Sequence, residues 1–367
     1  MKIGVPKEIL DQEYRVSLTP AGVYALASHG HTVYVENDAG LGSGITNDDY
    51  ISAGALILNN MNDIYTTSDM ILKVKQPLKE ECKLLKHDQI LFTYLHLAAD
   101  KELTLDLCRS KATCIAYETI ELPNGSLPLL TPMSEIAGRM SVQIGAHHLE
   151  KYFGGKGVLL GGVPGVEPAR VVIIGGGTVG INAAKMAIGL GAHVYILDNN
   201  LNRLRELDDY FHGRLQTVYS TQHKVVELIQ KADLVITAVL VAGAKAPKLI
   251  TTQLLKRMTP GSVIVDVAID QGGCVEGIRS TKHSDPIIKL GNVCVYAVPN
   301  IPGAVPFTST RALTNATLPY AIKLANNGYK AIFDDPSLAK GVNIHNGSLV
   351  HKVVAEALDM EYSTQAL

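Results

Sequence analysis

The chain has 367 residues, a formal net charge of −2 and 47% apolar residues, so it is long enough for two globular domains with buried cores. Charges of both signs are scattered along the chain, which disfavours a nucleic-acid or membrane-surface partner. The five cysteines are odd in number and form no C-x-x-C pair, which argues against a disulfide framework or a zinc site and fits a reducing cytosol.

The amino-terminal segment lacks the apolar core of a secretory signal, because Lys7 and Glu8 interrupt it early. No apolar run reaches the roughly 18 residues that a membrane-spanning helix needs. We therefore expect a cytoplasmic protein without a membrane partner.

The first third of the chain alternates short β-rich runs with amphipathic helical patterns. Helices are predicted over residues 20–28, where Thr19 supplies the cap and Pro20 the first position, and over residues 101–109. Continuous apolar strands separated by helices are typical of a parallel sheet that is covered on both faces. The strands predicted here are residues 2–5, 32–36, 70–75, 90–96 and 113–118.

A second series of the same kind follows, so the sequence predicts two doubly wound α/β units rather than one. Its predicted strands are residues 170–174, 193–198, 234–239, 262–267 and 294–298. Its predicted helices are residues 179–190, 202–211, 224–231 and 252–257.

Two longer helical patterns, residues 133–152 and 309–327, lie just before and just after this second series. Each is near 30 Å long at the rise of an α-helix, about 1.5 Å per residue. This order predicts that the second unit is inserted into the first. We expect a discontinuous domain of residues 1–128 and 307–367, with a late helix at residues 351–358, and an inserted domain of residues 129–306.

A glycine-rich loop, VVIIGGGTVG, follows the first strand of the inserted unit and opens its first helix. Its G-x-G-x-x-G pattern consists of Gly175, Gly177 and Gly180. The first glycine permits a tight turn, the second lets a pyrophosphate approach the backbone, and the third lets the helix pack on the strand. The pyrophosphate then binds the free N–H groups at the helix start, which include that of Thr178. This context predicts a Rossmann-like dinucleotide site.

Asp198 ends the next strand, about 20 residues after the second glycine, where a carboxylate usually binds the adenosine ribose. A carboxylate there repels a 2′-phosphate and favours NAD over NADP, although the nearby Arg203 could pair with a phosphate. The alternative interpretation is a glycine-rich turn that binds no ligand.

Three ionisable residues lie near strand ends or loops of the first unit, where ligand crevices form. His96 can shuttle a proton near neutral pH, or it can be a core histidine with a satisfied hydrogen bond. Lys75 shares a strand face with Lys73 and can hold a carboxylate, or it can be solvated. Arg15 suits bidentate carboxylate binding, but an exposed surface arginine is favoured from its position alone.

Two aspartates belong to the segment VDVAIDQGG of the inserted unit. Asp270 follows the strand and can orient an amine or a water near a nicotinamide. Asp266 is expected within the strand, where its carboxylate would be buried and hydrogen-bonded and would have a structural role. Since no H-x-x-x-H or H-E-x-x-H spacing occurs, no metal site is expected.

Several segments together resemble the bacterial alanine dehydrogenases of the alanine dehydrogenase/pyridine nucleotide transhydrogenase family. They occur in order over nearly the whole chain: GVPKE, E-x-RV-x-LTP, ENDAGLGSGI, KVKQP, LFTYLHLAA, LLTPMSEIAGRMS, VDVAIDQGG and NIPGAVP. The resemblance implies a catalytic domain made from both chain ends, an inserted NAD domain and a homohexamer. It also implies reversible, NAD-dependent oxidation of L-alanine to pyruvate and ammonia, with the substrate between the domains.

The resemblance implies residue roles as well. Arg15 and Lys75 would bind the substrate, and His96 and Asp270 would form the acid–base pair. The NAD site would further include Ser134, Asp198, Arg203, Ser220, Val239, Leu240, Val267, Ala268, Ile269, Asp270, Arg279, Val298, Pro299, Asn300 and Ile301.

The chain departs from the family pattern at three places. Gln76 stands where relatives often have Glu, and Ile301 replaces a common Met. Phe307 stands where several relatives carry Arg and others carry an aromatic residue. None of these removes an acid–base group. The other functions considered are the NAD(H)-binding subunit of a proton-translocating transhydrogenase, a saccharopine- or opine-type dehydrogenase, and a non-catalytic NAD-sensing protein.

Overall fold

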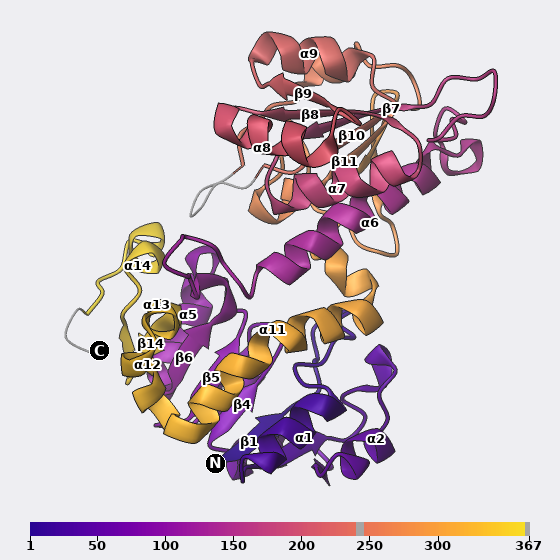
Figure 1. The fold of residues 1–367 in the computed structure, drawn as a ribbon. Helices are drawn as coiled ribbons and strands as arrows, with labels where there is room; N and C mark the ends of the chain where they lie inside the picture. The colour runs from indigo at the N-terminus through magenta and orange to yellow at the C-terminus, as the bar shows by residue number, and fades with distance from the viewer. Residues whose placement is uncertain (240–245, 364–367) are drawn as a thin grey trace. The chain divides into compact units, whose positions relative to one another are not determined.

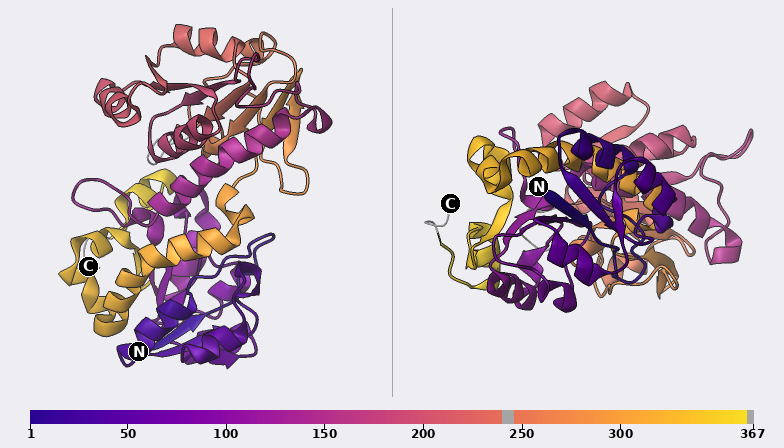
Figure 2. Two further views of the ribbon diagram at one scale, coloured as in Figure 1. Left: turned by 45° about the vertical axis from the view of Figure 1, so that its right-hand side comes forward. Right: turned by 90° about the horizontal axis from the view of Figure 1, so that it is seen from below.

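A computed structural model describes residues 1–239 and 246–363 and divides the chain into two compact units. The first unit comprises Met1–Met133 and Val305–Leu367, and the second comprises Ser134–Ala304. The amino- and carboxyl-terminal segments, indigo and yellow in Figure 2, thus belong to the same unit. Leu240, one of the residues expected at the NAD site, lies outside the described residues.

The first unit contains a sheet of eight described strands in the order β15-β14-β6-β5-β4-β1-β2-β3. The neighbours from β6 to β3 pair in parallel, whereas β14 is antiparallel to β6 and β15 is antiparallel to β14. The five strands that the sequence predicts here are parallel, as expected, and the antiparallel strands β14 and β15 come from a segment for which no strand was predicted. The strands are β1 (Lys2–Val5), β2 (Thr32–Glu36), β3 (Leu56–Leu58), β4 (Met70–Leu72), β5 (Ile90–Thr93), β6 (Thr113–Ala116), β14 (Val342–His345) and β15 (Ser348–Leu349).

Three central strands end earlier than predicted, at Leu72, Thr93 and Ala116. The apolar runs continue. After β4 and β5, one further amide still pairs with the neighbouring segment, at Lys73 and at Tyr94, and side-chain carboxylates accept the amides that follow. Glu8 accepts from the backbone N–H of Val74, and Glu118 accepts from that of His96. The residues that follow these strands at the carboxyl edge of the sheet therefore lie on bends, irregular segments or a 3-10 turn.

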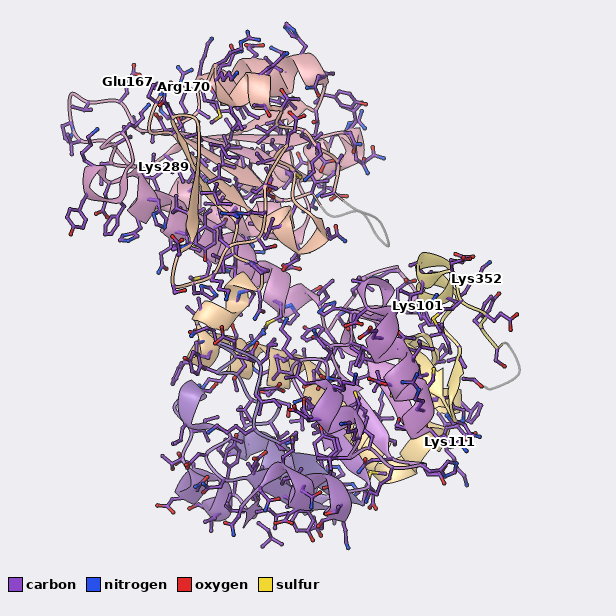
Figure 3. All side chains as sticks on the ribbon, turned by 180° about the vertical axis from the view of Figure 1, so that it is seen from behind. Lys101, Lys111, Glu167, Arg170, Lys289 and Lys352 are labelled. Atoms are coloured by element: carbon purple, nitrogen blue, oxygen red, sulfur yellow. The ribbon has the colours of Figure 1, made fainter. Side chains whose placement is uncertain are left out.

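Helices pack on both faces of this sheet. The cap expected for α1 is present, because the hydroxyl of Thr19 accepts from the backbone N–H of Gly22 at 3.4 Å. Helices α5 and α14 contact each other where Lys101 donates to the carbonyl of Leu358 at 3.3 Å, beside the labelled Lys101 and Lys352 in Figure 3. The helices are α1 (Pro20–Ser28), α2 (Asn47–Ser52), α3 (Met61–Thr67), α4 (Lys79–Cys82), α5 (Lys101–Ser110), α11 (Pro306–Asn327), α12 (Ala331–Asp334), α13 (Pro336–Gly341) and α14 (Lys352–Leu358).

The second unit contains a sheet of seven described strands in the order β12-β13-β11-β10-β7-β8-β9. All neighbours pair in parallel except β12, which is antiparallel to β13. This order is doubly wound about β7, as expected for a Rossmann-like unit. The strands are β7 (Arg170–Ile174), β8 (His193–Asp198), β9 (Gln216–Tyr219), β10 (Leu234–Thr237), β11 (Val263–Asp266), β12 (Ile287–Leu290) and β13 (Val293–Tyr296).

Alternate residues of these strands build two separate apolar cores. Val171 and Ile173 face one core with helices α6, α7 and α8, whereas Val172 and Ile174 face the other with α9 and α10. Figure 1 shows α7 and α8 on one side of the sheet and α9 on the other. The helices are α6 (Thr131–Leu149), α7 (Thr178–Gly189), α8 (Leu201–Phe211), α9 (Gln222–Gln230) and α10 (Thr252–Leu255). Among the described helices, none is long and apolar enough to cross a membrane.

Candidate active site

The glycine-rich loop connects β7 to α7 in the second unit. β7 begins at Arg170, labelled in Figure 3, and runs into Gly175, whose φ of 105° is a left-handed conformation that favours glycine. A Cβ atom on Gly175 would lie 2.6 Å from the carbonyl oxygen of Ala238. A Cβ atom on Gly180 would lie 1.9 Å from the carbonyl oxygen of Gly175, so only glycine lets α7 approach the loop.

Gly177 differs from these two glycines, because a Cβ atom there would meet no atom within 4 Å. Gly177 is exposed and precedes α7, whose first residue is the exposed Thr178. The free N–H groups of the first helical turn therefore have open space in front of them. Open space at the second glycine and a helix start beside it are what a dinucleotide pyrophosphate requires.

Asp198 lies next to the loop, at the end of β8. Its carboxylate accepts from the backbone N–H of Gly176 at 2.7 Å and from that of Asn200 at 2.8 Å. The backbone N–H of Ser220 donates to the carbonyl of Asp198 at 2.9 Å. The Nε of Arg203 donates to the carbonyl of Gly176 at 2.6 Å. The structure thus gathers these predicted cofactor residues at one edge of the sheet.

A second group of predicted cofactor residues meets around Asp270. This exposed aspartate belongs to the 3-10 turn Val267–Gln271, directly after β11, and it accepts from the backbone N–H of Asn300 at 3.1 Å. Asn300 has a left-handed φ of 57°, and it follows the half-buried Pro299. The two predicted segments are therefore joined here: Val267, Ala268, Ile269 and Asp270 with Val298, Pro299, Asn300 and Ile301.

The remaining predicted cofactor residues are placed separately. Ser134 is half-buried on α6, Val239 is half-buried just after β10, and Arg279 is exposed in the segment before β12. The hydrogen bonds of the described residues connect none of these three to Asp198 or Asp270. No group of three His, Cys, Asp or Glu side chains suited to a metal ion occurs in the described ranges.

Asp266 is a structural residue, as expected for a position within the strand. It is fully buried, and its carboxylate accepts from the hydroxyl of Thr237 at 2.5 Å and from the backbone N–H of Cys274 at 2.8 Å. Burial raises the pKa of Asp266, and these hydrogen bonds oppose the rise. Its contacts tie the end of β11 to β10.

Arg15 is buried in the first unit, so the expectation of an exposed surface arginine is wrong. Its side chain is 2% exposed, and its Nε and Nη2 atoms each donate to Glu13 at 2.6 Å. Its Nη1 atom lies 3.2 Å from the sulfur of Met133. Burial alone would lower the pKa of Arg15, but hydrogen bonds and the charge of Glu13 raise it. The guanidinium is thus held charged in a fixed orientation.

Lys75 lies close to the same carboxylate. Burial alone would raise the pKa of Glu13, but Arg15 lowers it, and the charge of Lys75 contributes to the lowering. Lys75 is half-buried, on the bend that follows β4. Glu13 therefore brings together the two cations expected to bind the substrate.

His96 is exposed, so the core-histidine alternative is wrong. Its side chain is 46% exposed, and its ring stacks on Tyr94 with centroids 5.7 Å apart. The backbone at His96 has a left-handed φ of 52°, and its N–H donates to Glu118 at 2.6 Å. Electrostatic interaction also connects the buried Tyr94 to Arg15. One local cluster therefore contains the three predicted residues of the first unit.

The sequence did not single out several residues of this cluster: Glu8, Glu13, Tyr94, Glu118 and Met133. Most of them are ordinary carboxylates or apolar positions whose partners come from distant segments. Only Glu13 had a local signal, because it stands two residues before Arg15 and its chemistry complements a guanidinium.

Comparisons with known proteins match both units. Residues 4–137 match the family described as alanine dehydrogenase/PNT, N-terminal domain, and residues 141–352 match alanine dehydrogenase/PNT, C-terminal domain. A curated alanine dehydrogenase from Methanococcus maripaludis is 58% identical over 365 residues, covering 99% of this chain and 98% of that protein. A second, from Geobacillus stearothermophilus, is 54% identical over 366 residues, with 99% and 98% coverage.

Solved structures agree with the sequence relatives. A structure titled L-alanine dehydrogenase has a TM-score of 0.95 and 54% identity, and the match covers 98% of this chain and 99% of that chain. A transhydrogenase from Sinorhizobium meliloti has a TM-score of 0.82 and 26% identity, with 96% and 99% coverage.

Proposed function

The chain belongs to the alanine dehydrogenase/PNT family, and we propose that it catalyses the NAD-dependent, reversible oxidation of L-alanine to pyruvate and ammonia. It is an oxidoreductase that acts on the CH–NH2 group of alanine. The observation that carries this function is identity of 50–58% with curated alanine dehydrogenases along the full chain. The transhydrogenase alternative has weaker support, because the matching structure is 26% identical.

NAD is the proposed cofactor, and when bound it would supply the acceptor for the hydride of the substrate Cα. The open approach at Gly177 and the helix start at Thr178 suit its pyrophosphate. Asp198 suits the adenosine ribose, because its carboxylate stands beside the loop and would repel a 2′-phosphate. Asp270 and Asn300 are proposed to line the nicotinamide end.

The substrate carboxylate is proposed to bind Arg15 and Lys75. Glu13 holds the Nε and Nη2 atoms of Arg15, and the sulfur of Met133 lies against Nη1, so the guanidinium would meet the substrate carboxylate in one orientation. A fixed, charged guanidinium can then orient the substrate without reorganising. Lys75 adds a second positive charge for the carboxylate or the carbonyl oxygen.

His96 and Asp270 are proposed to move protons. The amine must be neutral when hydride leaves Cα, and a water must then lose a proton to hydrolyse the iminium. His96 has an exposed ring and a backbone fixed by Glu118, so it can exchange protons with substrate and solvent. Asp270 is exposed and can orient the amine or the water.

We propose that the enzyme is a cytoplasmic homohexamer, as the resemblance to its family implies. Exposed apolar side chains in the segment that contains Leu159, Val163 and Val166 support association between copies. Sedimentation velocity measures the oligomeric state, and a monomeric mass at working concentrations would contradict the proposed hexamer.

A spectrophotometric screen for NADH formation across small L-amino acids tests the function. Alanine should give the highest kcat/KM, and pyruvate with ammonia should oxidise NADH. A transhydrogenase subunit would instead exchange hydride between nucleotides and leave alanine untouched. NADH binding without turnover of any amino acid would favour a sensor, and turnover of larger substrates would favour an opine-type dehydrogenase.

A further inference from the structure

The bend that carries Lys75 has lost its pairing with β1 but still contacts the segment of β5 on its other side. The register between β1 and β4 ends at the pair Gly4 and Ile71, so later amides on that side have no strand partner. On the other side, β5 continues to hold the bend. The backbone N–H of Tyr94 donates to the carbonyl of Val74 at 3.3 Å, and the hydroxyl of Thr93 donates to that of Lys75 at 2.9 Å.

Glu8 supplies the missing acceptor. Its Oε1 atom accepts from the backbone N–H of Val74 at 2.6 Å and from that of Lys75 at 3.4 Å. Glu8 is 8% exposed, and it stands just after β1, where the strand stops pairing. A buried amide without an acceptor is costly, so the position of this carboxylate fixes the position of the bend.

A buried cation holds Glu8 in turn. Its Oε2 atom lies 3.1 Å from the Nζ of Lys73, which is fully buried and lies 2.6 Å from Glu81. Burial alone would lower the pKa of Lys73, but the two carboxylates raise it and keep the ammonium charged. The hydroxyl of Tyr65 also donates to Glu81 at 3.1 Å. Glu8 is therefore held at both oxygens, by the backbone amides of the bend and by the buried ammonium of Lys73.

We propose that Glu8 is a positioning residue, whose carboxylate fixes the backbone from which Lys75 reaches the substrate. This inference rests on the proposed role of Lys75 in substrate binding. Glu81 provides the contrast, because it holds the same Lys73 but has a different second contact. Its Oε2 atom accepts from the backbone N–H of Leu78 at the start of α4, at 2.8 Å.

Glu8→Gln and its matched control Glu81→Gln in the full-length protein separate positioning from stability. Both variants should lower Tm, because each leaves Lys73 with one carboxylate fewer. Only Glu8→Gln should raise the pyruvate KM, by about tenfold or more, since small displacements of a binding group cost that much. NADH affinity should stay unchanged in both. Equal changes of KM in the two variants would overturn the proposal.

A double variant shows whether Glu8 acts through Lys75. In a Lys75→Ala background, Glu8→Gln should raise KM little further, because the positioned group is already gone. Full additivity would overturn the proposal. Should Glu8→Gln fail to fold, Glu8→Asp keeps the charge facing Lys73 but is one methylene shorter, and its KM should lie between those of wild type and Lys75→Ala.

Hydrogen exchange separates this inference from the proposed function. If wild type turns over no alanine or pyruvate, the proposed function fails, but the amides of residues 74 and 75 still report on Glu8. They should exchange faster in Glu8→Gln than in Glu81→Gln. Unchanged exchange there would overturn the role of Glu8 even in an active enzyme.

Discussion

A buried arginine defines the substrate side of the site at the scale of single residues. Arginine is seldom fully buried unless it is paired. Arg15 is 2% exposed because Glu13, two residues earlier, neutralises it through a two-point hydrogen bond. The pair holds the guanidinium in one orientation. This contact lets a single side chain combine a permanent charge with a fixed geometry.

Arg15→Lys should raise KM for alanine and pyruvate by about tenfold or more, because a point charge cannot replace the planar fork. NADH affinity should hardly change, since Arg15 lies in the first unit and the glycine-rich loop in the second. Steady-state kinetics and NADH titration measure both quantities. Arg109→Lys, at an exposed position of α5, is the control and should leave both unchanged. Lost NADH affinity with an unchanged pyruvate KM would show that Arg15 is no substrate ligand.

Glu13→Gln should change how stability depends on pH. Arg15 lowers the pKa of Glu13 in the folded protein, so the pair stabilises the fold above the unfolded value, about 4.3. That contribution is lost as the pH falls through the lowered folded pKa. Removing one partner of a buried pair costs about 3–5 kcal/mol at neutral pH. The difference in free energy of unfolding between wild type and variant should therefore shrink in acid, and a constant difference down to pH 2 would contradict this.

Asp198→Ala should weaken NAD binding and shift preference toward NADP. The repulsive carboxylate is removed, while Arg203 remains next to the loop at Gly176. Kinetics with both cofactors give the ratio of their kcat/KM values. Asp209→Ala on the exposed side of α8 serves as the control. An unchanged ratio would show that Asp198 does not face the ribose.

At the scale of secondary-structure elements, the loop between β7 and α7 allows opposite predictions for two glycines. Gly177→Ala should fold normally and lose NADH affinity, since its methyl group meets open space that the pyrophosphate would occupy. Gly180→Ala should instead lower Tm strongly, because its methyl group would overlap the carbonyl of Gly175. Gly189→Ala in the same helix has room and should leave affinity unchanged. Normal NADH affinity in Gly177→Ala would contradict the proposed cofactor position.

The central elements could be predicted from the sequence, because their apolar runs are continuous and their helices carry caps. The strands β1, β2, β7 and β8 and helix α1 lie where the patterns placed them. The strands β3, β9, β12, β14 and β15 were missed. Most lie at or near the sheet edges and are only two to four residues long, and several are half-exposed. In so short a strand, apolar and polar residues alternate too few times to give a recognisable pattern.

The parts of the candidate site that could be predicted are those whose residues lie close together in the sequence. Gly175, Gly177, Gly180 and Asp198 belong to one β-α-β unit with known spacing, so their grouping could be anticipated. Glu8 could not, since its partner Val74 lies 66 positions away and the contact depends on where β1 stops pairing. The burial of Arg15 also depends on packing that no local pattern reveals.

At the scale of the whole molecule, the proposed substrate-binding and cofactor-binding residues belong to different units. The first unit carries the proposed substrate ligands and His96, and the second carries the dinucleotide loop and Asp270. Each unit has its own apolar core, so each site can be altered without removing the packing of the other. This separation makes coupling between His96 and Asp270 a direct test of a shared reaction.

His96→Ala and Asp270→Asn should each lower kcat by about 10²-fold or more, the usual scale for losing a positioned proton-transfer group. Both variants should keep their Tm and bind NADH, because both side chains are exposed and neither belongs to the glycine-rich loop. His87→Ala, at another exposed histidine, is the control and should retain full activity. Since the two groups serve one chemical sequence, the double variant should lose much less than the product of the single losses. Multiplying losses would mean that His96 and Asp270 act on separate steps, and a normal kcat in His96→Ala would remove His96 from the proton path.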